Sequence, residues 1–338
     1  MIRSACAARR WLHWPARRLP GGERPAKHHL SRALILAVTP NPALDITYEI
    51  SCVRWHEASN RVESVARRAG GKGINVARVL HQLGEDAAIV GYLGGMTGAA
   101  VRDELAASGL RDETVPLEAE TRLTVFVVES SGEVTGLSEP GPAIERDDWQ
   151  ALEERCAALL SSASVMTVSG SLPPGAPLDG MGRLIAMARA AGVPGIIDTR
   201  DEWLHHGLEG APAIVKVNEE ELEGYMPEAP LLDAASDMRE RGAGAVVVSL
   251  GAAGLVAVSE QGTFEARPPE RQRGNPTGAG DATTAAIAAG LKRKMPWTDV
   301  LGEAVAVGAA SVLHPLAGSF DAAAYRRMRG QIDVKQIA

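Results

Sequence analysis

From residue 34 onward, short apolar and β-branched runs alternate with segments of helical periodicity. This alternation limits the possible folds more than any other feature of the sequence. Strands are predicted over 34–38, 87–92, 165–168, 195–198, 214–217 and 245–249. Helices are predicted over 74–83, 178–190, 280–291 and 298–313, the last two closing the chain. Strands joined through helices pair in parallel and are covered on both faces. The sequence therefore predicts an α/β fold with a mostly parallel central sheet flanked by helices on both faces.

Two segments interrupt this alternation, residues 46–68 and 122–137. Both have the pattern of paired strands without a long helix between them, and the second turns at Ser130-Ser131-Gly132. We expect them to form a small β lid that stands off the main sheet. Because ligands bind at the carboxyl ends of the strands in open α/β sheets, such a lid would cover a ligand there.

Charge is divided unevenly along the 338 residues, which include 35 basic and 42 acidic side chains. Eight bases and one acid fall in residues 1–33, so 34–338 keeps 27 bases and 41 acids, a net charge of −14. An acidic body lacks the basic face that nucleic acid and anionic lipid require, and we expect neither partner. We expect a disordered or spurious basic leader over 1–33, with a serine-poor transit peptide as the alternative, and one folded domain over 34–338.

Cysteine spacing and hydropathy favour a cytoplasmic protein. Cys6, Cys52 and Cys156 lie far apart, without the paired spacing of a zinc site or redox motif, which indicates unlinked thiols in a reducing cytosol. Residues 242–259 carry no charge and resemble a membrane span in that respect. Their glycines and two β-branched clusters instead favour two buried strands joined at Gly251, so no membrane span is expected.

Two glycine-rich segments, 69–77 and 274–282, each open a predicted helix, where glycine lets a backbone approach a ligand closely. The first is not a Walker phosphate loop, because position 66 is alanine and position 73 is glycine. The second begins like a dinucleotide fingerprint, but Thr283 occupies the position of the third glycine. This argues against a Rossmann dehydrogenase.

The Gly-Ala-Gly-Asp run at 278–281 suits phosphoryl transfer. Small residues at a helix start leave N–H groups open to an anion, and the helix dipole favours negative charge there. Such a cradle fits a phosphoryl group whose charge is redistributing, and Asp281 beside it can accept the proton of an attacking hydroxyl. The alternative is that Asp281 only stabilises the helix N-terminus, but the preceding small residues favour catalysis.

With these motifs the chain resembles the PfkB/ribokinase family of carbohydrate kinases, in particular its phosphosugar branch of 1-phosphofructokinases and tagatose-6-phosphate kinases. One family signature runs over 70–77 and on to Gly84 and Gly94, and the other spans 275–288. The resemblance covers roughly residues 34–320. It implies a ribokinase-like domain that uses ATP and Mg²⁺ to phosphorylate a sugar, with a β lid that often mediates a homodimer.

The resemblance also implies site residues. The catalytic set is Asp281 as general base with an anion hole formed by Gly278, Ala279 and Gly280. The sugar pocket is implied to contain Asp45, Gly70, Gly71 and Asn75. Asp45 would hold sugar hydroxyls, because a carboxylate accepts two hydrogen bonds at once; a turn or cap residue is the alternative.

A family Asn-x-x-Glu element corresponds to Asn218 and Glu221, the expected neighbours of magnesium and phosphate. These contacts would pass through waters, because Mg²⁺ keeps part of its hydration shell. Taken alone, the acidic run 219–221 favours a solvated helix start instead. The residues implied to contact ATP are Lys216, Ser249, Gly251, Gly254 and Thr277.

Cations are needed for the phosphate that the substrate already carries. Arg122, Arg61 and Lys72 are the candidates, and the guanidinium fork of arginine can bond two phosphate oxygens. Surface ion pairing is the alternative for either arginine. Ser171, in the loop 169–175, would add a hydroxyl at the sugar pocket.

The sequence departs from the family pattern at three positions. Thr124 stands where the branch often has Asn, Val217 replaces a proline, and Arg200 replaces the usual serine. Thr124 and Arg200 bear on which sugar phosphate fits, whereas none of the three is the expected base.

We therefore predict ATP-dependent phosphorylation of fructose 1-phosphate at O6. Fructose 6-phosphate and tagatose 6-phosphate, phosphorylated at O1, are the alternatives within the family. The Asn-Pro-x-x-Asp motif at 41–45 and Gly-Gly-Lys-Gly at 70–73 favour this branch over ribokinase or adenosine kinase. A non-catalytic sugar-phosphate or nucleotide sensor is the alternative of a different class, and the presence of Asp281 and the glycine pair argues against it.

Overall fold

Strand β1 (Leu34–Thr39) is buried on both of its faces. Ile35 and Ala37 belong to one hydrophobic cluster, whereas Leu36 and Val38 belong to another. A strand buried on both faces requires helices above and below the sheet, which explains its continuous apolar sequence. The structure, a computed structural model, describes residues 34–337, so the expected leader over 1–33 lies outside the described residues.

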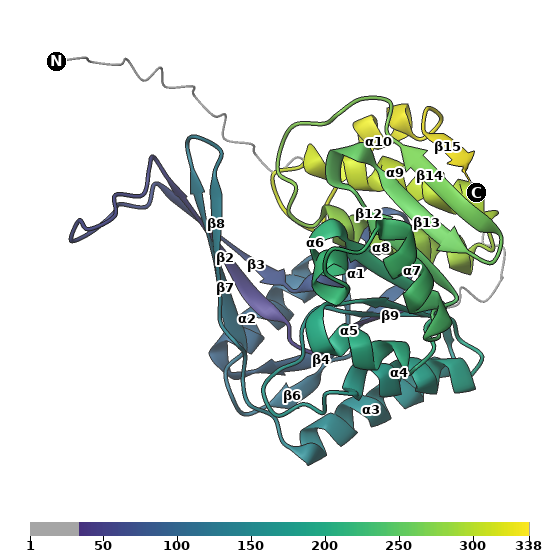
Figure 1. The fold of residues 1–338 in the computed structure, drawn as a ribbon. Coiled ribbons are helices and arrows are strands. Elements are labelled where there is room, and N and C mark those ends of the chain that lie inside the picture. The colour runs from purple at the N-terminus through teal and green to yellow at the C-terminus, as the bar shows by residue number, and fades with distance from the viewer. Residues whose placement is uncertain (1–33, 338) are drawn as a thin grey trace, which may run out of the picture. The chain divides into compact units, whose positions relative to one another are not determined.

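The central sheet contains 11 strands (Figure 1). In spatial order its path comprises β15 (Asp333–Gln336), β14 (Gly262–Arg267), β13 (Leu255–Ser259), β12 (Ala245–Ser249), β11 (Ile214–Asn218), β10 (Gly195–Asp198), β9 (Ala163–Ser169), β1, β4 (Ala87–Gly94) and β5 (Arg111–Asp112), and β6 (Val115–Leu117) also pairs with β4. All pairs from β12 to β5 are parallel, and those from β12 to β15 are antiparallel. The predicted mostly parallel sheet is confirmed, and the uncharged segment 242–259 contains two strands, as predicted.

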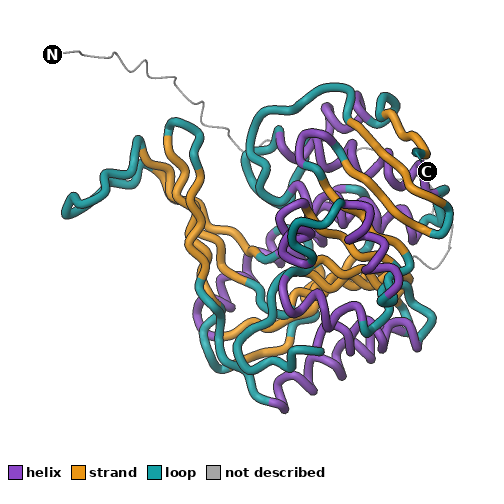
Figure 2. The backbone as a smooth tube through the Cα atoms, in the orientation of Figure 1, coloured by secondary structure: helices purple, strands orange, loops and turns teal. Residues whose placement is uncertain are grey.

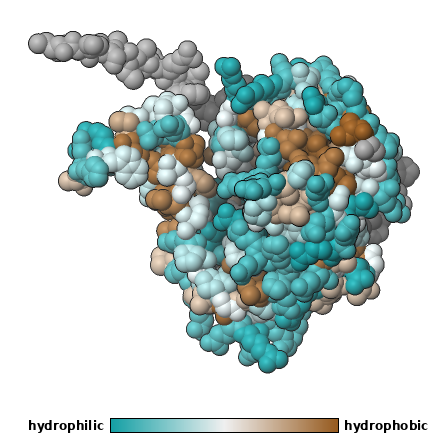
Figure 3. All heavy atoms as spheres, in the orientation of Figure 1, coloured by the Kyte–Doolittle hydropathy of each residue, from teal (hydrophilic) through white to brown (hydrophobic). Residues whose placement is uncertain are grey.

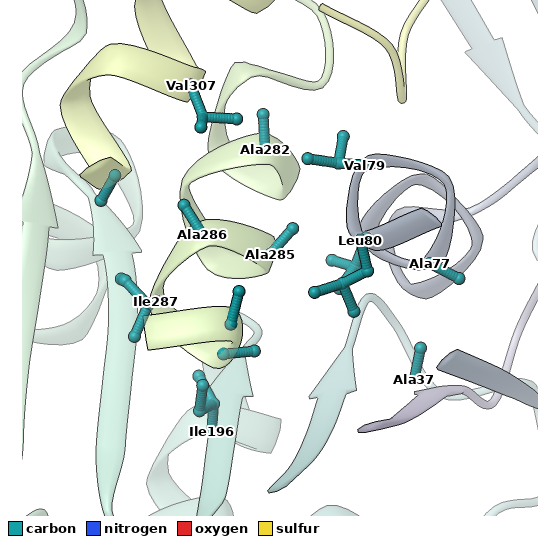
Figure 4. Close-up of a cluster of buried hydrophobic side chains, with 14 of the residues drawn as sticks. Ala37, Ala77, Val79, Leu80, Ile196, Ala282, Ala285, Ala286, Ile287 and Val307 are labelled. Atoms are coloured by element: carbon teal, nitrogen blue, oxygen red, sulfur yellow. The ribbon is translucent and has the colours of Figure 1, made fainter. Parts of the chain in front are cut away.

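Helices cover both faces of this sheet, also as predicted. One face carries α1 (Lys72–Gln82), α2 (Gly95–Ala107), α8 (Ala279–Lys292), α9 (Trp297–Val312) and α10 (Ala322–Met328). The opposite face carries α3 (Arg146–Leu160), α4 (Gly180–Ala190), α5 (Asp201–Leu208), α6 (Glu219–Tyr225) and α7 (Leu231–Glu240). Small residues let α8 pack closely on α1: Ala282 and Ala285 face Val79 and Leu80 (Figure 4). None of the helices within 34–337 is long and apolar enough to span a membrane.

Some predicted boundaries need correction. The predicted helix over 178–190 begins at Gly180, and Leu178 is 50% exposed outside it. The helices predicted to close the chain, α8 and α9, are followed by α10 and β15. These two elements span only seven and four residues, which is too short to show a clear hydrophobic period.

A second, four-stranded sheet stands beside the central one (Figure 2). Its order is β3 (Ser64–Gly70), β2 (Ala43–Ile50), β7 (Arg122–Glu129) and β8 (Val134–Ser138). Strand β2 begins three residues before the predicted segment, because Ala43 to Asp45 already pair with β3 and β7. Between β2 and β3, residues 51–63 form a loop that is mostly exposed.

Candidate active site

A first cavity of about 650 Å³ opens at the carboxyl ends of β1, β9 and β10, beside the small sheet. Three residues predicted to hold the substrate line it: Lys72, Arg122 and Ser171. The other polar residues in its wall are Thr39, Asn41, Ser138, Glu139, Thr199, Arg200 and Glu221. The arrangement agrees with the general position of ligands in open α/β sheets.

Asp45 and Gly70, both predicted to contact the sugar, are brought together in the small sheet but are not in the wall of this cavity. Asp45 pairs with Arg68 of β3 and Thr124 of β7, and a Cβ atom at Gly70 would lie 2.0 Å from the Asp45 carboxyl carbon. Gly70 is therefore required for the Asp45 carboxyl to occupy this space. Burial raises the pKa of Asp45 to about 7, although the charge of Arg122 opposes the shift.

Gly71 and Asn75 belong to the start of α1. Gly71 caps the helix with φ 107°, in the region that favours glycine, and a Cβ there would approach Pro42 and Thr39 to 3.1 Å. Asn75 is buried and points its amide at Asp281. The first glycine-rich segment thus contacts both the β1 loop and the second glycine-rich segment.

A second cavity, of about 940 Å³, lies between β11, β12, α8 and α9. It is lined by the predicted ATP contacts Lys216, Ser249, Gly251 and Gly254, together with Asn218, Ala279 and Gly280. Thr277, also predicted to contact ATP, is not in its wall, and its N–H instead donates to Asn275 Oδ1 at 3.0 Å. Arg271 and Arg273 line the cavity and were not predicted, because they lie in an irregular loop without a motif.

The start of α8 forms a cradle with Lys216. Gly278 caps the helix in the left-handed conformation, with φ 81°, and no side chain caps the first turn. The Ala279 N–H, predicted to belong to the anion hole, donates to Pro276 O at 3.1 Å, whereas the N–H groups of Gly280 and Asp281 make no hydrogen bond within residues 34–337. A Cβ at Gly280 would lie 2.6 Å from Lys216 Nζ, so the ammonium group lies directly against the helix start. Main-chain N–H groups, the helix dipole and this cation all favour an anion at one point.

Asp281 follows this cradle and is only 6% exposed. Asn75 Nδ2 donates to its Oδ2 at 2.8 Å, and within residues 34–337 its Oδ1 has no hydrogen bond. Burial and the nearby charge of Asp198 raise the pKa of Asp281 to about 6, against the charge of Lys72 and the Asn75 hydrogen bond. A carboxylate with a pKa near neutrality and an open oxygen is suited to accept a proton.

Asp198, at the carboxyl end of β10, was missed by the motif analysis. This fully buried carboxylate accepts from Lys72 Nζ at 2.6 Å and Thr284 Oγ1 at 3.0 Å, and pairs with Lys216 Nζ at 3.3 Å. Burial alone would raise the pKa of Asp198, but the two ammonium groups hold it below its usual range. Since Lys72 lines the first cavity and Lys216 the second, Asp198 connects them.

Asn218 and Glu221 form a reciprocal cap at the start of α6. Asn218 Oδ1 accepts from the Glu221 N–H at 2.7 Å, and Glu221 Oε2 accepts from the Asn218 N–H at 2.9 Å. Glu221 Oε1 also pairs with Lys72 Nζ at 2.9 Å. The acidic run 219–221 is therefore at a helix start, as the alternative interpretation has it, but Glu221 is only 9% exposed and so is not solvated.

Arg122 and Arg61 are placed differently. Arg122 Nε donates to Asn41 O at 3.1 Å and its Nη1 to Glu139 O at 3.2 Å, which fixes the guanidinium in the wall of the first cavity. Arg61 is exposed in the loop 51–63 and lines neither cavity. Asn41 is the first residue of the Asn-Pro-x-x-Asp motif, and no role was predicted for it. It lines the first cavity, and its Nδ2 donates to Ser171 Oγ at 3.1 Å.

Comparisons with known proteins agree with this geometry. The sequence model of the pfkB family of carbohydrate kinases matches residues 39–323. Phosphofructokinase-2 from Escherichia coli, solved with potassium, has 29% identity and a TM-score of 0.82, covering 88% of this chain and 98% of that chain. The same protein has been solved in complex with fructose-6-phosphate.

Two structures from Thermotoga maritima bear on the fold alone. A possible 1-phosphofructokinase has 23% identity and a TM-score of 0.81, with 90% of this chain and 100% of that chain covered. Ribokinase has 18% identity and a TM-score of 0.71, with 87% and 98% covered. The predicted ribokinase-like fold is thereby confirmed.

Proposed function

The chain belongs to the pfkB family of carbohydrate kinases, and from this premise we propose that it phosphorylates fructose 1-phosphate at O6. The products are fructose 1,6-bisphosphate and ADP. One observation carries the proposal: the buried carboxylate of Asp281 directly follows a helix-start anion cradle, and Asp198 pairs with Lys72 in the wall of the first cavity and with Lys216 in the wall of the second. Such a site can hold a nucleotide and a second polar ligand against one proton acceptor.

In the proposed reaction the O6 hydroxyl oxygen attacks the γ-phosphorus of ATP. Asp281 Oδ1 accepts the hydroxyl proton, the new O–P bond forms, and the bond from the γ-phosphorus to the bridging oxygen breaks. ADP leaves with that electron pair. Asn75 holds the carboxylate through Oδ2, which leaves Oδ1 available for the hydroxyl proton.

Negative charge on the transferred phosphoryl group would be stabilised by the N–H groups at the start of α8 and by Lys216. Both are in place before the ligand binds, and Lys216 is held by its pairing with Asp198. Preorganised donors of this kind need no rearrangement during transfer, which is why they lower the barrier.

Magnesium fits this site as a companion of ATP. Both Glu221 oxygens and Asn218 Oδ1 already have protein partners, and no group of three or more acidic, histidine or cysteine side chains suited to a metal occurs within residues 34–337. Mg²⁺ is commonly bound by phosphate oxygens and water with few protein ligands. Asn218 and Glu221 would contact it through waters, and the ion would neutralise charge on the β- and γ-phosphates.

The first cavity would receive the sugar phosphate. Arg122 and Ser171 in its wall would hold the phosphate. Asp45 is not in the wall but is close enough to Arg122 to feel its charge, and it would accept hydrogen bonds from sugar hydroxyls. Fructose 6-phosphate is the second candidate, favoured by the complex of the 29% identical Escherichia coli protein with that sugar.

A homodimer through the small sheet is also part of the proposal. The sheet exposes Val65, Val134 and Leu137, with 47, 43 and 60% of each residue accessible. Figure 3 shows apolar surface gathered on this part of the molecule. Trp55, in the adjoining loop, is 74% exposed. Burying these residues against a second copy would remove them from water, which is the main driving force for association.

ADP release from the purified full chain tests the proposed function. We expect turnover with ATP, Mg²⁺ and fructose 1-phosphate, and weaker or no turnover with fructose 6-phosphate, tagatose 6-phosphate, ribose and adenosine. Activity on ribose or adenosine alone would contradict the phosphosugar assignment. Tight binding of a sugar phosphate without any ADP release would favour the sensor alternative.

A further inference from the structure

Thr199, Arg200 and Trp203 follow β10 and line the first cavity, but the proposed reaction gives them no role. Thr199 Oγ1 donates to Gly170 O at 2.8 Å and ties the end of β10 to the end of β9. The next residue, Arg200, and Trp203 of α5 both line the cavity. The backbone that carries Arg200 is therefore fixed at the edge of the cavity.

Arg200 differs from the other cations of this cavity in its hydrogen bonding. Lys72 is committed to Asp198 and Glu221, and Arg122 donates to two main-chain carbonyls. Among the cations that line the cavity in the described part of the chain, Arg200 alone makes no hydrogen bond. It has an ion pair of 3.3 Å with its neighbour Asp201, both side chains being more than 60% exposed, and such pairs are weak.

Arg200 also fails to stabilise the helix that it precedes. It occupies the N-cap of α5, where serine, threonine, aspartate or asparagine would accept an N–H and a positive charge faces the positive end of the helix. The first residue of the helix, Asp201, has φ 55°, which is uncommon for residues other than glycine, although aspartate tolerates it better than most. A residue that destabilises its own local structure is expected at a position where its side chain contacts a ligand.

We propose that Arg200 binds the phosphate group of the sugar phosphate and makes the first cavity select phosphorylated over unphosphorylated sugars. This rests on the proposed function, because it assigns a residue to the substrate cavity of that reaction. Arg122, at the start of β7 in the small sheet, and Arg200, directly after β10 of the central sheet, line the same cavity, so both would contribute positive charge to a phosphate bound there. A planar guanidinium can bond two phosphate oxygens, and a neutral sugar offers it no equivalent partner.

The test compares Arg200→Ser with the wild-type full chain by calorimetric titration of fructose 1-phosphate and fructose. We expect the Kd for fructose 1-phosphate to rise about tenfold, the usual scale for one charge-assisted hydrogen bond at a partly exposed site, with little change for fructose. Arg200→Lys should fall between the two proteins. Serine can cap α5, so the variant should keep or gain thermal stability.

Arg146→Ser is the matched control, because Arg146 is exposed at the start of α3 and lines neither cavity. It should bind both sugars like the wild type. An unchanged Kd for fructose 1-phosphate in Arg200→Ser would overturn the inference, and so would an equal loss for both sugars. Because binding is measured without turnover, a chain that binds but releases no ADP would refute the proposed kinase reaction and leave the Arg200 result interpretable.

Discussion

At the level of single residues, the pKa of Asp281 should determine the pH dependence of the reaction. Burial raises this pKa to about 6, so the carboxyl group is protonated below that pH and cannot accept a proton. We expect kcat, measured with ATP and sugar phosphate both saturating so that binding through Asp45 does not contribute, to fall about tenfold per pH unit below about 6 and to level off above it. An acidic limb centred near pH 4, the ordinary range of an aspartate, would contradict this assignment.

Gly280 tests the anion cradle. In Gly280→Ala the new Cβ would lie 2.6 Å from Lys216 Nζ, and Lys216 is buried and paired with Asp198, so its ammonium group must move. We expect kcat to fall by roughly 10- to 100-fold, because displacing one oxyanion donor typically costs that much or more. Gly330→Ala, where a Cβ would meet nothing within 4 Å, is the control and should keep wild-type kinetics.

At the level of secondary-structure elements, Asp198 joins β10 to α1, β11 and α8. Its pairs with Lys72 and Lys216 are largely buried, so Asp198→Asn removes the counter-charge of the buried Lys216 and leaves Lys72 with Glu221 alone. We expect a loss of about 3–5 kcal/mol in the free energy of unfolding, measured by urea denaturation. Asp103→Asn, an exposed position on α2, should change it by less than about 0.5 kcal/mol. A small effect at Asp198 would contradict its central place in the ion-pair network.

The elements differ in how well the sequence predicts them. Strands β10 and β12 begin and end at their predicted residues, because each is a short run of buried, mostly β-branched apolar residues that ends at a polar one. Asp281 and its glycine neighbours form a local motif that can be recognised in one dimension. Asp198 could not be found in this way, because its partner Lys72 lies 126 residues away and meets it only through the fold.

At the level of the whole molecule, the acidic body from residue 34 to 338 must bind two polyanions. Its net charge of −14 opposes long-range attraction of ATP and sugar phosphates. In the proposed reaction, binding would therefore come from local groups, such as Lys216 with the start of α8 and Arg122 in the first cavity. The structure gathers these cations at the carboxyl edge of the central sheet and beside the small sheet.

Association of two chains is a separate prediction at this scale. Leu137→Lys combined with Val65→Lys places two charges on the small sheet, and we expect it to shift the mass measured by light scattering from dimer to monomer. Leu232→Lys, on α7 with 42% exposure, is the matched control and should leave the dimer intact. A wild-type chain that is monomeric at all concentrations tested would refute the dimer.

The kcat of Asp281→Asn with ATP, Mg²⁺ and fructose 1-phosphate tests most directly whether Asp281 is the general base. Asparagine keeps the size of the side chain but cannot accept the proton, so we expect kcat to fall by roughly 10²–10⁴-fold. The folded-state pKa of Asp281 is raised from 3.8 to about 6, so at pH 7 its ionised form destabilises the fold; the variant should therefore unfold no more easily than the wild type. A folded Asp281→Asn variant with near wild-type kcat would contradict the account.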